Sequence, residues 1–175
     1  MVNPNLVLDY INTLDLRPYE EALETPAQLG AWLVEHGLLD EGARVTGRDL
    51  KEAIRVREAL RDLLAAQNGL DADVEAATAA IDDASCKAEY MLRFADGRSR
   101  LEATAPGVRG ALGRLLSEVS AAMTDGTWSR MKACRAADCR WAFLDTAKNR
   151  SRAWCSMESC GNRAKVQAYR ERHHH

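Results

Sequence analysis

The sequence lacks the features that mark several classes of protein. It has no uninterrupted apolar run of about 18 residues, which excludes a membrane-spanning helix. Its first residues, MVNPNLVLDYINTLD, have no basic segment followed by a long apolar one, so we expect no secretory signal. There is no internal repeat and no low-complexity linker. With 46% hydrophobic residues, the chain is expected to be a soluble, cytoplasmic globular protein of one or two domains.

Histidines and recognisable catalytic motifs are also scarce. Three of the four histidines are residues 173–175, which we interpret as the remnant of a purification tag. The remaining one, His36, is expected at the end of a helix, where a cationic side chain suits the helix dipole. The sequence contains no nucleophile–base pair, no Gly-rich phosphate loop and no carboxylate pair. We therefore expect no enzymatic activity.

Charge is distributed unevenly along the chain. Residues 130–175 carry 11 Lys and Arg against four acids, a net charge of +7, whereas residues 1–129 carry a net charge of -9. A basic module beside an acidic domain indicates a polyanion partner. A solvated basic face is an equal alternative on charge alone.

Capping residues and apolar spacing predict a mainly helical N-terminal domain. Thr25 and Thr46 are each followed three residues later by Gln or Asp, the pattern of a capping box. The apolar stretch at 6–14 is either a strand or a helix. The predicted helices run from Thr25 to Gly37, from Thr46 to about Gln67, from Asp71 or Asp73 through Ile81, and from Val108 to Asp125.

Asp96-Gly97 lies between two runs, 88–94 and 98–104, that predict a β-hairpin. Cys86, just before it, is expected to be a small buried residue. The predicted fold class is α+β: a mainly helical domain with a β-hairpin at residues 1–126, followed by a small treble-clef-like zinc finger at residues 127–172.

The finger is predicted from two close pairs of cysteines. Cys134 and Cys139 are separated by four residues, as are Cys155 and Cys160, and fifteen residues lie between the pairs. This spacing fits one tetrahedral zinc ion, and four thiolates leave no open position for water, so the zinc is expected to be structural. Four unrelated thiols or an iron–sulfur cluster are the alternatives.

The residues between and after the cysteines suggest the rest of the module. Arg140–Leu144 and residues 152–154 predict two strands joined by a turn, and a helix is expected from about Gly161 to Arg172. Val166 and Tyr169 on that helix are expected to face the hairpin. Cys134–Cys139 is expected to form a knuckle, and the order of knuckle, hairpin and helix is that of a treble-clef finger. About 45 residues bury too little to fold alone, so zinc is expected to decide whether the segment folds.

Basic and amide side chains in the module suit nucleic acid. Arg and Asn read base edges, and Lys suits phosphate. Bracing of the zinc loops is the alternative role for several of them, including Asn162. The candidate nucleic-acid-binding residues are Lys148, Arg150, Arg152, Asn162, Arg163, Lys165 and Arg170.

Several segments together resemble a known pair of domains. Residues 128–134, Asp145, Asn149–Arg152 and Trp154–Met157, with the ending Cys160-Gly161-Asn162-Arg163, resemble the CGNR zinc finger. Residues 8–13 and 25–33 are similar to the ABATE domain found before that finger. The resemblance implies a bacterial, stress-induced transcription regulator.

These observations predict a zinc-dependent regulator that binds duplex DNA through its finger. The N-terminal domain would sense a small-molecule effector or form a homodimer, with Asp9, Asn12, Thr13 and Arg17 as a candidate ligand pocket. Asn12 and Thr13 are equally plausible as turn or capping residues. The alternative function is a protein-interaction or RNA-binding module. In it, the net charge of +7 would bind an acidic partner, or Trp141 and Trp154 would stack on bases.

Overall fold

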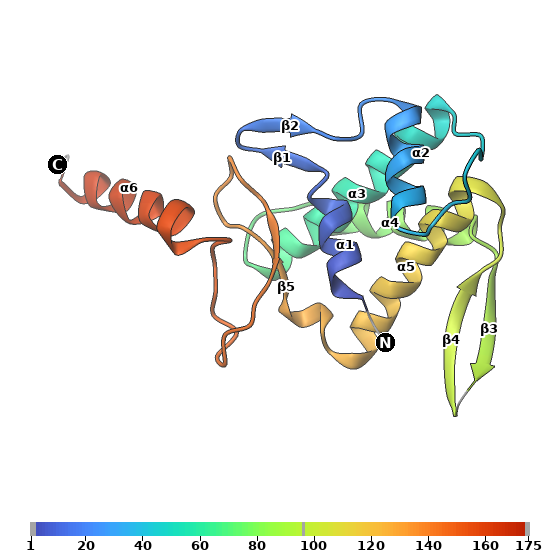
Figure 1. Cartoon of the computed structure of the whole chain (residues 1–175). Coiled ribbons are helices and arrows are strands. Elements are labelled where there is room, and N and C mark those ends of the chain that lie inside the picture. Colours follow the sequence, from blue (N-terminus) through green and yellow to red (C-terminus); the bar gives the residue numbers. More distant parts are fainter. Residues whose placement is uncertain (1–2, 96, 174–175) are drawn as a thin grey trace.

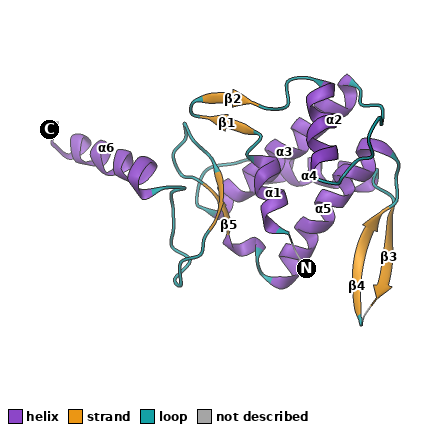
Figure 2. Cartoon of the chain, in the orientation of Figure 1, coloured by secondary structure: helices purple, strands orange, loops and turns teal. Residues whose placement is uncertain are grey.

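The computed structural model describes residues 3–95 and 97–173, which form six α-helices and three two-stranded antiparallel sheets (Figure 1, Figure 2). The helices are α1 (Pro4–Ile11), α2 (Pro26–Glu35), α3 (Gly47–Gln67), α4 (Val74–Cys86), α5 (Gly107–Asp125) and α6 (Asn162–His173). The strand pairs are β1 (Leu14–Leu16) with β2 (Tyr19–Glu21), β3 (Tyr90–Ala95) with β4 (Arg98–Ala103), and β5 (Met131–Ala133) with β6 (Ala142–Leu144). The α+β fold class is confirmed. No helix among the described residues is long and apolar enough to cross a membrane.

The predicted helix starts are confirmed by their caps. Thr25 Oγ1 accepts a hydrogen bond from the N–H of Gln28, whose side chain accepts one from the N–H of Thr25. Thr46 and Asp49 form the same reciprocal pair at the start of α3. Asp73, rather than Asp71, caps α4. Each cap satisfies N–H groups that the first helical turn leaves without a partner.

The N-terminal domain is organised around α3, which contacts α1, α2, α4 and α5. Its core consists of aliphatic side chains such as Leu60 and Leu115, which are fully buried with Tyr10 and Ile11 of α1. The stretch at 6–14 is therefore mostly helix, with β1 beginning at Leu14. His36 ends α2 and stacks on Trp32, and its Nδ1 lies 2.8 Å from the Trp32 carbonyl, so it has a structural role.

Two buried arginines on α3 were not anticipated from its apolar spacing. Arg57 is 1% exposed and donates two hydrogen bonds of 2.7 Å to the carboxylate of Glu21. Arg61 is fully buried and donates to the carbonyls of Ile11, Leu14 and Arg140. Because Arg140 belongs to the C-terminal segment, Arg61 links that segment to the N-terminal core.

The hairpin of the C-terminal segment differs from the predicted one. Residues 142–144 pair with β5, the strand that precedes the first cysteine pair in the sequence, and not with residues 152–154. Met131 is fully buried in the N-terminal core, and the side-chain amide of Asn12 donates to and accepts from the backbone of Ala142 at 2.9 and 2.8 Å. The side chain of Asn68 donates to two further carbonyls of the segment. The β5–β6 hairpin is thus packed on the N-terminal domain.

Helix α6 extends away from the rest of the molecule (Figure 1). None of its described side chains is buried, and Val166 and Tyr169 are 50% and 57% exposed. The expectation that these two side chains face the hairpin is therefore wrong. The hairpin that would have covered them lies on the N-terminal core instead.

The predicted hairpin after α4 is confirmed as β3–β4, with Ala95 opposite Arg98. Cys86, at the end of α4, is exposed, so the expectation that it is buried is wrong. Asp96 of the predicted turn lies outside the described residues, as do Met1, Val2 and two of the three residues interpreted as a tag, His174 and His175. His173 lies at the end of α6.

Candidate metal centre and basic surface

The four cysteines predicted to bind metal lie together. Cys134 and Cys139 lie in the turn between β5 and β6, Cys155 lies in the following loop, and Cys160 lies in a π-helical turn directly before α6. Their sulfur atoms are all within 4.8 Å of one another, with Cys139 and Cys160 at 3.6 and 3.7 Å from Cys155. Four sulfurs at 2.3 Å from a tetrahedral zinc ion are about 3.8 Å apart. The cluster therefore fits one zinc ion.

Backbone geometry shapes this cluster. In the first turn, the N–H groups of Cys139 and Arg140 both donate to the carbonyl of Ala136, and Arg140 has a positive φ of 49°. At the second pair, a Cβ on Gly161 would lie 2.7 Å from the Met157 sulfur. Glycine after Cys160 therefore allows the chain to turn tightly from the metal site into α6.

Interactions within the cluster move the pKa values of its thiols in opposite directions. A hydrogen bond from the Cys139 thiol, helped by backbone N–H groups, holds the pKa of Cys134 at about 5. The same bond raises the pKa of Cys139, which donates it. Burial raises the pKa of Cys155 to about 12. Because several adjacent thiolates repel one another, a divalent cation is needed to deprotonate the whole set.

Arg163 supports the metal site from α6. Its Nη2 lies 3.3 Å from the Cys160 sulfur, and its Nη1 is 2.5 Å from the carboxylate of Asp138 in the first cysteine turn. These bonds raise the pKa of Arg163 and lower that of Asp138. Arg163 therefore compensates negative charge on the sulfur and ties α6 to the first cysteine turn. Residues that contact metal ligands commonly have this role.

Arg152 also supports the site, from the loop before Cys155. Its Nε donates to the carbonyl of Trp154 at 2.9 Å, and its guanidinium lies 4.8 Å from the centre of the Phe143 ring. Its backbone N–H donates to Asp145, a fully buried carboxylate that also accepts from Lys132 at 2.7 Å. The predicted residue Arg152 thus makes contacts within the protein.

The other predicted nucleic-acid residues lie on the surface. Lys148 and Arg150 are exposed in the loop after β6, where the Arg150 guanidinium is 3.3 Å from the Ser129 hydroxyl. Lys165 and Arg170 are exposed on α6. Asn162 is exposed, and its side chain donates to the carbonyl of Glu158 at 3.2 Å.

A cleft of about 970 Å³ lies between α6 and the first cysteine turn. Arg163 and Arg170 line it from α6, Arg135 from the turn, and Arg17 from the β1–β2 hairpin. Arg135 was missed in the sequence because its place in the cleft depends on the fold of the turn. Arg17 was assigned to another site, and its Nε lies 3.8 Å from the carboxylate of Asp138.

The structure does not bring Asp9, Asn12, Thr13 and Arg17 together around one pocket. Asp9 is exposed, and Asn12 binds the backbone of the finger. The Thr13 hydroxyl donates to the Tyr10 carbonyl at 2.8 Å and accepts from the guanidinium of a buried arginine. Asn12 and Thr13 therefore have structural roles.

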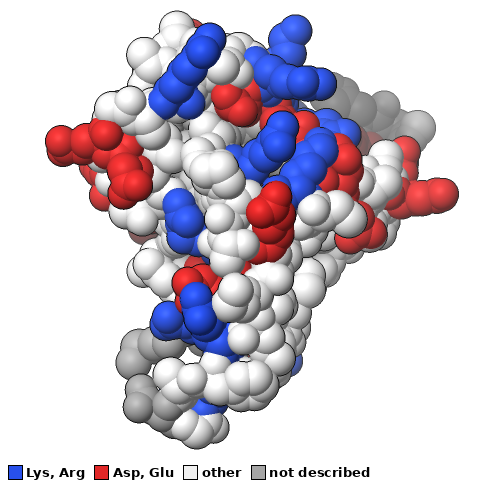
Figure 3. All heavy atoms as spheres, turned by 90° about the vertical axis from the view of Figure 1, so that its right-hand side faces the viewer, with Lys and Arg blue, Asp and Glu red and all other residues white. Residues whose placement is uncertain are grey.

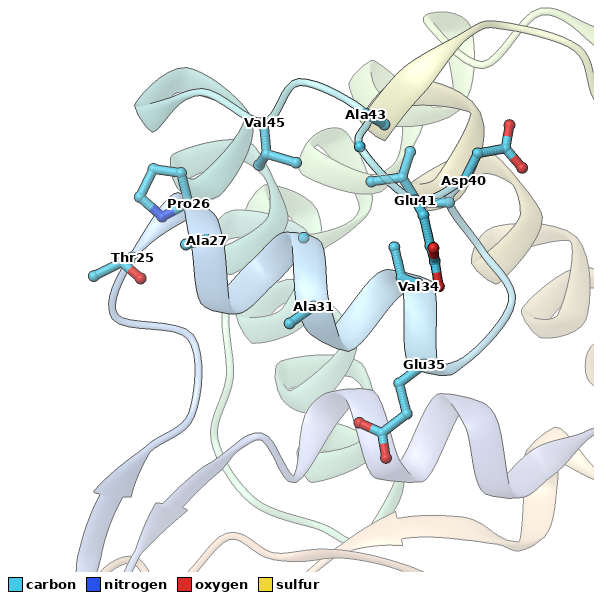
Figure 4. Close-up of a pocket in the computed structure, with 13 residues that line it drawn as sticks. Thr25, Pro26, Ala27, Ala31, Val34, Glu35, Asp40, Glu41, Ala43 and Val45 are labelled. Atoms are coloured by element: carbon cyan, nitrogen blue, oxygen red, sulfur yellow. The ribbon is translucent and has the colours of Figure 1, made fainter.

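The N-terminal domain has a different pocket of about 810 Å³ between α2 and the loop after it (Figure 4). Its walls are mainly small and apolar, with Ala27, Ala31 and Val34 contributed by α2 and Ala43 and Val45 by the loop. The acidic residues among those that line it are Glu35, Asp40 and Glu41.

Comparison with protein families assigns both parts of the chain. Residues 4–126 match the model of ABATE, described as "Putative stress-induced transcription regulator". Residues 130–173 match the model of the CGNR zinc finger. A search of curated proteins found no match. The ABATE match covers more than half of the sequence, and the CGNR match contains all four clustered cysteines, so the chain belongs to the ABATE family of regulators and ends in a CGNR zinc finger.

Proposed function

We propose that this protein is a zinc-dependent transcription regulator whose finger binds duplex DNA, while its N-terminal domain senses a ligand or mediates dimerisation. The observation that carries the proposal is the form of α6. Its first turn is held at the cysteine cluster through Cys160 and Arg163, and the rest of the helix is exposed and rich in basic residues.

The charges of the finger support a polyanion partner. Three of its basic residues, Lys132, Arg140 and Arg163, have a carboxylate within 4 Å. The exposed basic residues for which no carboxylate lies that close within the described part of the chain are Arg135, Lys148, Arg150, Lys165, Arg170 and Arg172. Excess cations on an exposed surface suit phosphates, whose contacts supply most of the affinity for nucleic acid.

The dimensions of α6 suit the major groove. Its 12 residues span about 18 Å, and a helix with side chains is about 10–12 Å across. The major groove of DNA is about 12 Å wide and admits one helix. Arg17 of the N-terminal domain also lines the cleft beside α6, where it lies 3.8 Å from the carboxylate of Asp138, so both domains border the proposed contact.

The role proposed for the N-terminal domain is binding and not catalysis. Its internal histidine is engaged with Trp32, and Thr13 with Tyr10 and Arg57, so these groups serve the fold. The apolar pocket in Figure 4 is the place proposed for an effector, because small apolar walls with a few acidic groups at the rim suit a compact ligand.

One observation favours a second candidate function. Val166 and Tyr169 are exposed apolar side chains on α6, and a protein partner would cover them. A protein-interaction or RNA-binding module is therefore the alternative, and it predicts weak binding to duplex DNA.

The test measures binding to duplex DNA across salt concentrations. Lys165→Ala with Arg170→Ala removes two exposed cations of α6 that do not touch the cysteines. We expect at least about a tenfold loss of affinity and a salt slope smaller by about 1.8, since each phosphate contact contributes about 0.9.

The matched control removes two exposed arginines from the N-terminal domain, Arg48→Ala with Arg109→Ala, at the same cost in charge. This control is expected to keep the affinity. Equal loss in both variants would mean that only overall charge matters, and unchanged binding in the α6 variant would overturn the proposal. Tighter binding to single-stranded RNA than to duplex DNA would favour the alternative.

A further inference from the structure

The β3–β4 hairpin projects from the side of the molecule opposite α6 (Figure 1). Its base is attached closely to α5: Tyr90 Oη donates to the Gly113 carbonyl at 3.1 Å, and a Cβ on Gly113 would lie 2.6 Å from that of Ala103. Beyond this base the hairpin forms a narrow projection, and one side of it is mostly uncharged (Figure 3). A two-stranded hairpin is only marginally stable without packing.

One face of the hairpin is apolar and largely uncovered. Leu92 is paired with Leu101, and Phe94 with Ser99, so these side chains point to the same face as Tyr90. Phe94 is 78% exposed, Leu92 52% and Leu101 41%. The opposite face carries Met91, Arg93, Arg98, Arg100 and Glu102.

A groove of about 1090 Å³ separates β4 from the C-terminal half of α5. Arg98 and Arg100 line it from the hairpin, and Glu118 and Asp125 line it from α5. Within the described residues, both carboxylates accept hydrogen bonds from backbone N–H groups and neither forms an ion pair. The arginines therefore line one wall of the groove, where Arg100 also pairs with Glu102 at 3.5 Å, and carboxylates line the other wall.

We propose that the apolar hairpin face and this groove form a dimerisation surface for a second copy of the chain. The two hairpins cross about a twofold axis, and the apolar face of each covers that of the other. The arginines of one copy then approach Glu118 and Asp125 of the other.

The charge pattern favours a second copy over another partner. In a twofold interface each surface patch meets itself, so a patch with both signs of charge is self-complementary. An acidic partner would satisfy only the arginines, and a basic partner only the carboxylates.

The area needed leads to the same arrangement. Six residues of a two-stranded ribbon measure about 20 by 10 Å, so the hairpin face alone offers about 200 Å². A stable interface buries about 800 Å² on each partner. The partner must therefore also fill the groove along α5, where the charged residues lie.

This inference does not rest on DNA binding. The hairpin and α6 lie on opposite sides of the molecule (Figure 1), so both fingers of such a dimer stay exposed. A dimer that does not bind DNA, or a monomer that does, would separate the two proposals.

The test is sedimentation velocity of the full chain from about 1 to 100 µM. We expect the mass to rise with concentration towards twice the monomer's 19.4 kDa. Phe94→Asp is expected to weaken dimerisation by at least about tenfold, as loss of a central aromatic anchor does. Val74→Asp is the matched control, since Val74 is 46% exposed on α4, outside the hairpin and the groove, and it is expected to dimerise like the natural protein.

A charge exchange tests the arrangement independently of the apolar face. Arg100→Glu and Glu118→Arg should each weaken self-association through like charges, and an equal mixture of the two variants should restore a dimer. A monomeric natural protein at about 100 µM would overturn the proposal, including the case in which a different protein covers the hairpin. Equal loss in Phe94→Asp and Val74→Asp, or no restoration in the mixture, would also overturn it.

Discussion

Removal of zinc should unfold α6 while leaving the β5–β6 hairpin in place. Helix α6 has no buried side chain, so packing contributes little to its stability beyond the contacts of Arg163. The turn directly before α6 is fixed at the metal site by Cys160, and Arg163 in the first turn of α6 contacts the Cys160 sulfur, so the metal site supplies the nucleus of the helix. In contrast, Met131, Ala133 and Ala142 of the hairpin belong to the N-terminal core.

The size of the effect follows from helix nucleation. A nucleation constant of about 10⁻³ means that losing a preformed first turn shifts the helix–coil equilibrium about 1000-fold, or about 4 kcal/mol. A helix of 12 residues is marginal in water without that help. The structural zinc itself contributes about 10–16 kcal/mol at neutral pH, enough to hold the whole cysteine turn.

Hydrogen exchange followed by mass spectrometry measures this directly, with and without a chelator. Peptides covering Val166–Ala168 should exchange at the rate of an unfolded chain once zinc is removed, and peptides covering 131–133 and 142–144 should stay protected. Far-UV circular dichroism should lose the signal of about one 12-residue helix. Cys160→Ser should behave like the chelated protein, whereas Cys86→Ser, at an exposed cysteine outside the cluster, should not. Persistent protection of α6 in metal-free protein would refute the reasoning, as would loss of the hairpin with the helix.

Three further predictions concern an ion pair of the N-terminal domain, a link between the two domains and a contact at the metal site. Glu21→Gln should cost about 3 kcal/mol at neutral pH by breaking a buried ion pair. Burial alone would raise the pKa of Glu21, but hydrogen bonds from Arg57 hold this pKa below its ordinary value. The stabilisation by the ion pair is therefore present above about pH 4 and is lost as pH falls through the lowered pKa. Urea unfolding at several pH values should show the stabilities of the natural protein and the variant converging in acid. Asn68→Ala should cost about 1–3 kcal/mol, because it removes the side-chain donor from the buried carbonyl of Ala133 and one of the two donors from the carbonyl of Ala153, which also accepts from the N–H of Arg135. A change below the error of thermal unfolding would contradict its linking role. Arg163→Ala should lower zinc affinity about 10–100-fold in a competition assay, because Arg163 contacts the Cys160 sulfur, whereas unaltered zinc affinity would mean that this contact is incidental.

Features set by neighbouring residues could be predicted from the sequence. The capping boxes at Thr25 and Thr46 need only side chains three residues apart, and both are present in the structure. The cysteine cluster follows from two short spacings and the preference of zinc for four thiolates. The Asp-Gly pair between two extended runs was sufficient to place the β3–β4 hairpin.

Features set by distant contacts could not be predicted in the same way. The strand at 142–144 could pair with the segment before it, 131–133, or with the segment after it, 152–154. Its pairing with β5 depends on the N-terminal core that both strands join. Arg57 and Arg61 are buried because carboxylate and carbonyl groups from other elements surround them, which apolar spacing on α3 does not reveal.

The placement of α6 has the same origin. Val166 and Tyr169 resemble a packing face in the sequence, but the hairpin expected to receive them is occupied by the N-terminal domain. This exposure changes the interpretation of the finger. Its helix is held at one end by the metal site and is otherwise available to a partner.

The central claim is that zinc holds a basic helix in position to bind DNA. The most direct measurement compares binding of metal-free and zinc-loaded protein to the same DNA duplex across a range of salt concentrations. We expect the zinc-loaded protein to bind with an affinity that falls steeply with salt, the metal-free protein to bind much more weakly, and added zinc to restore binding. Equal binding with and without zinc, or no binding by the fully loaded protein, would contradict the claim.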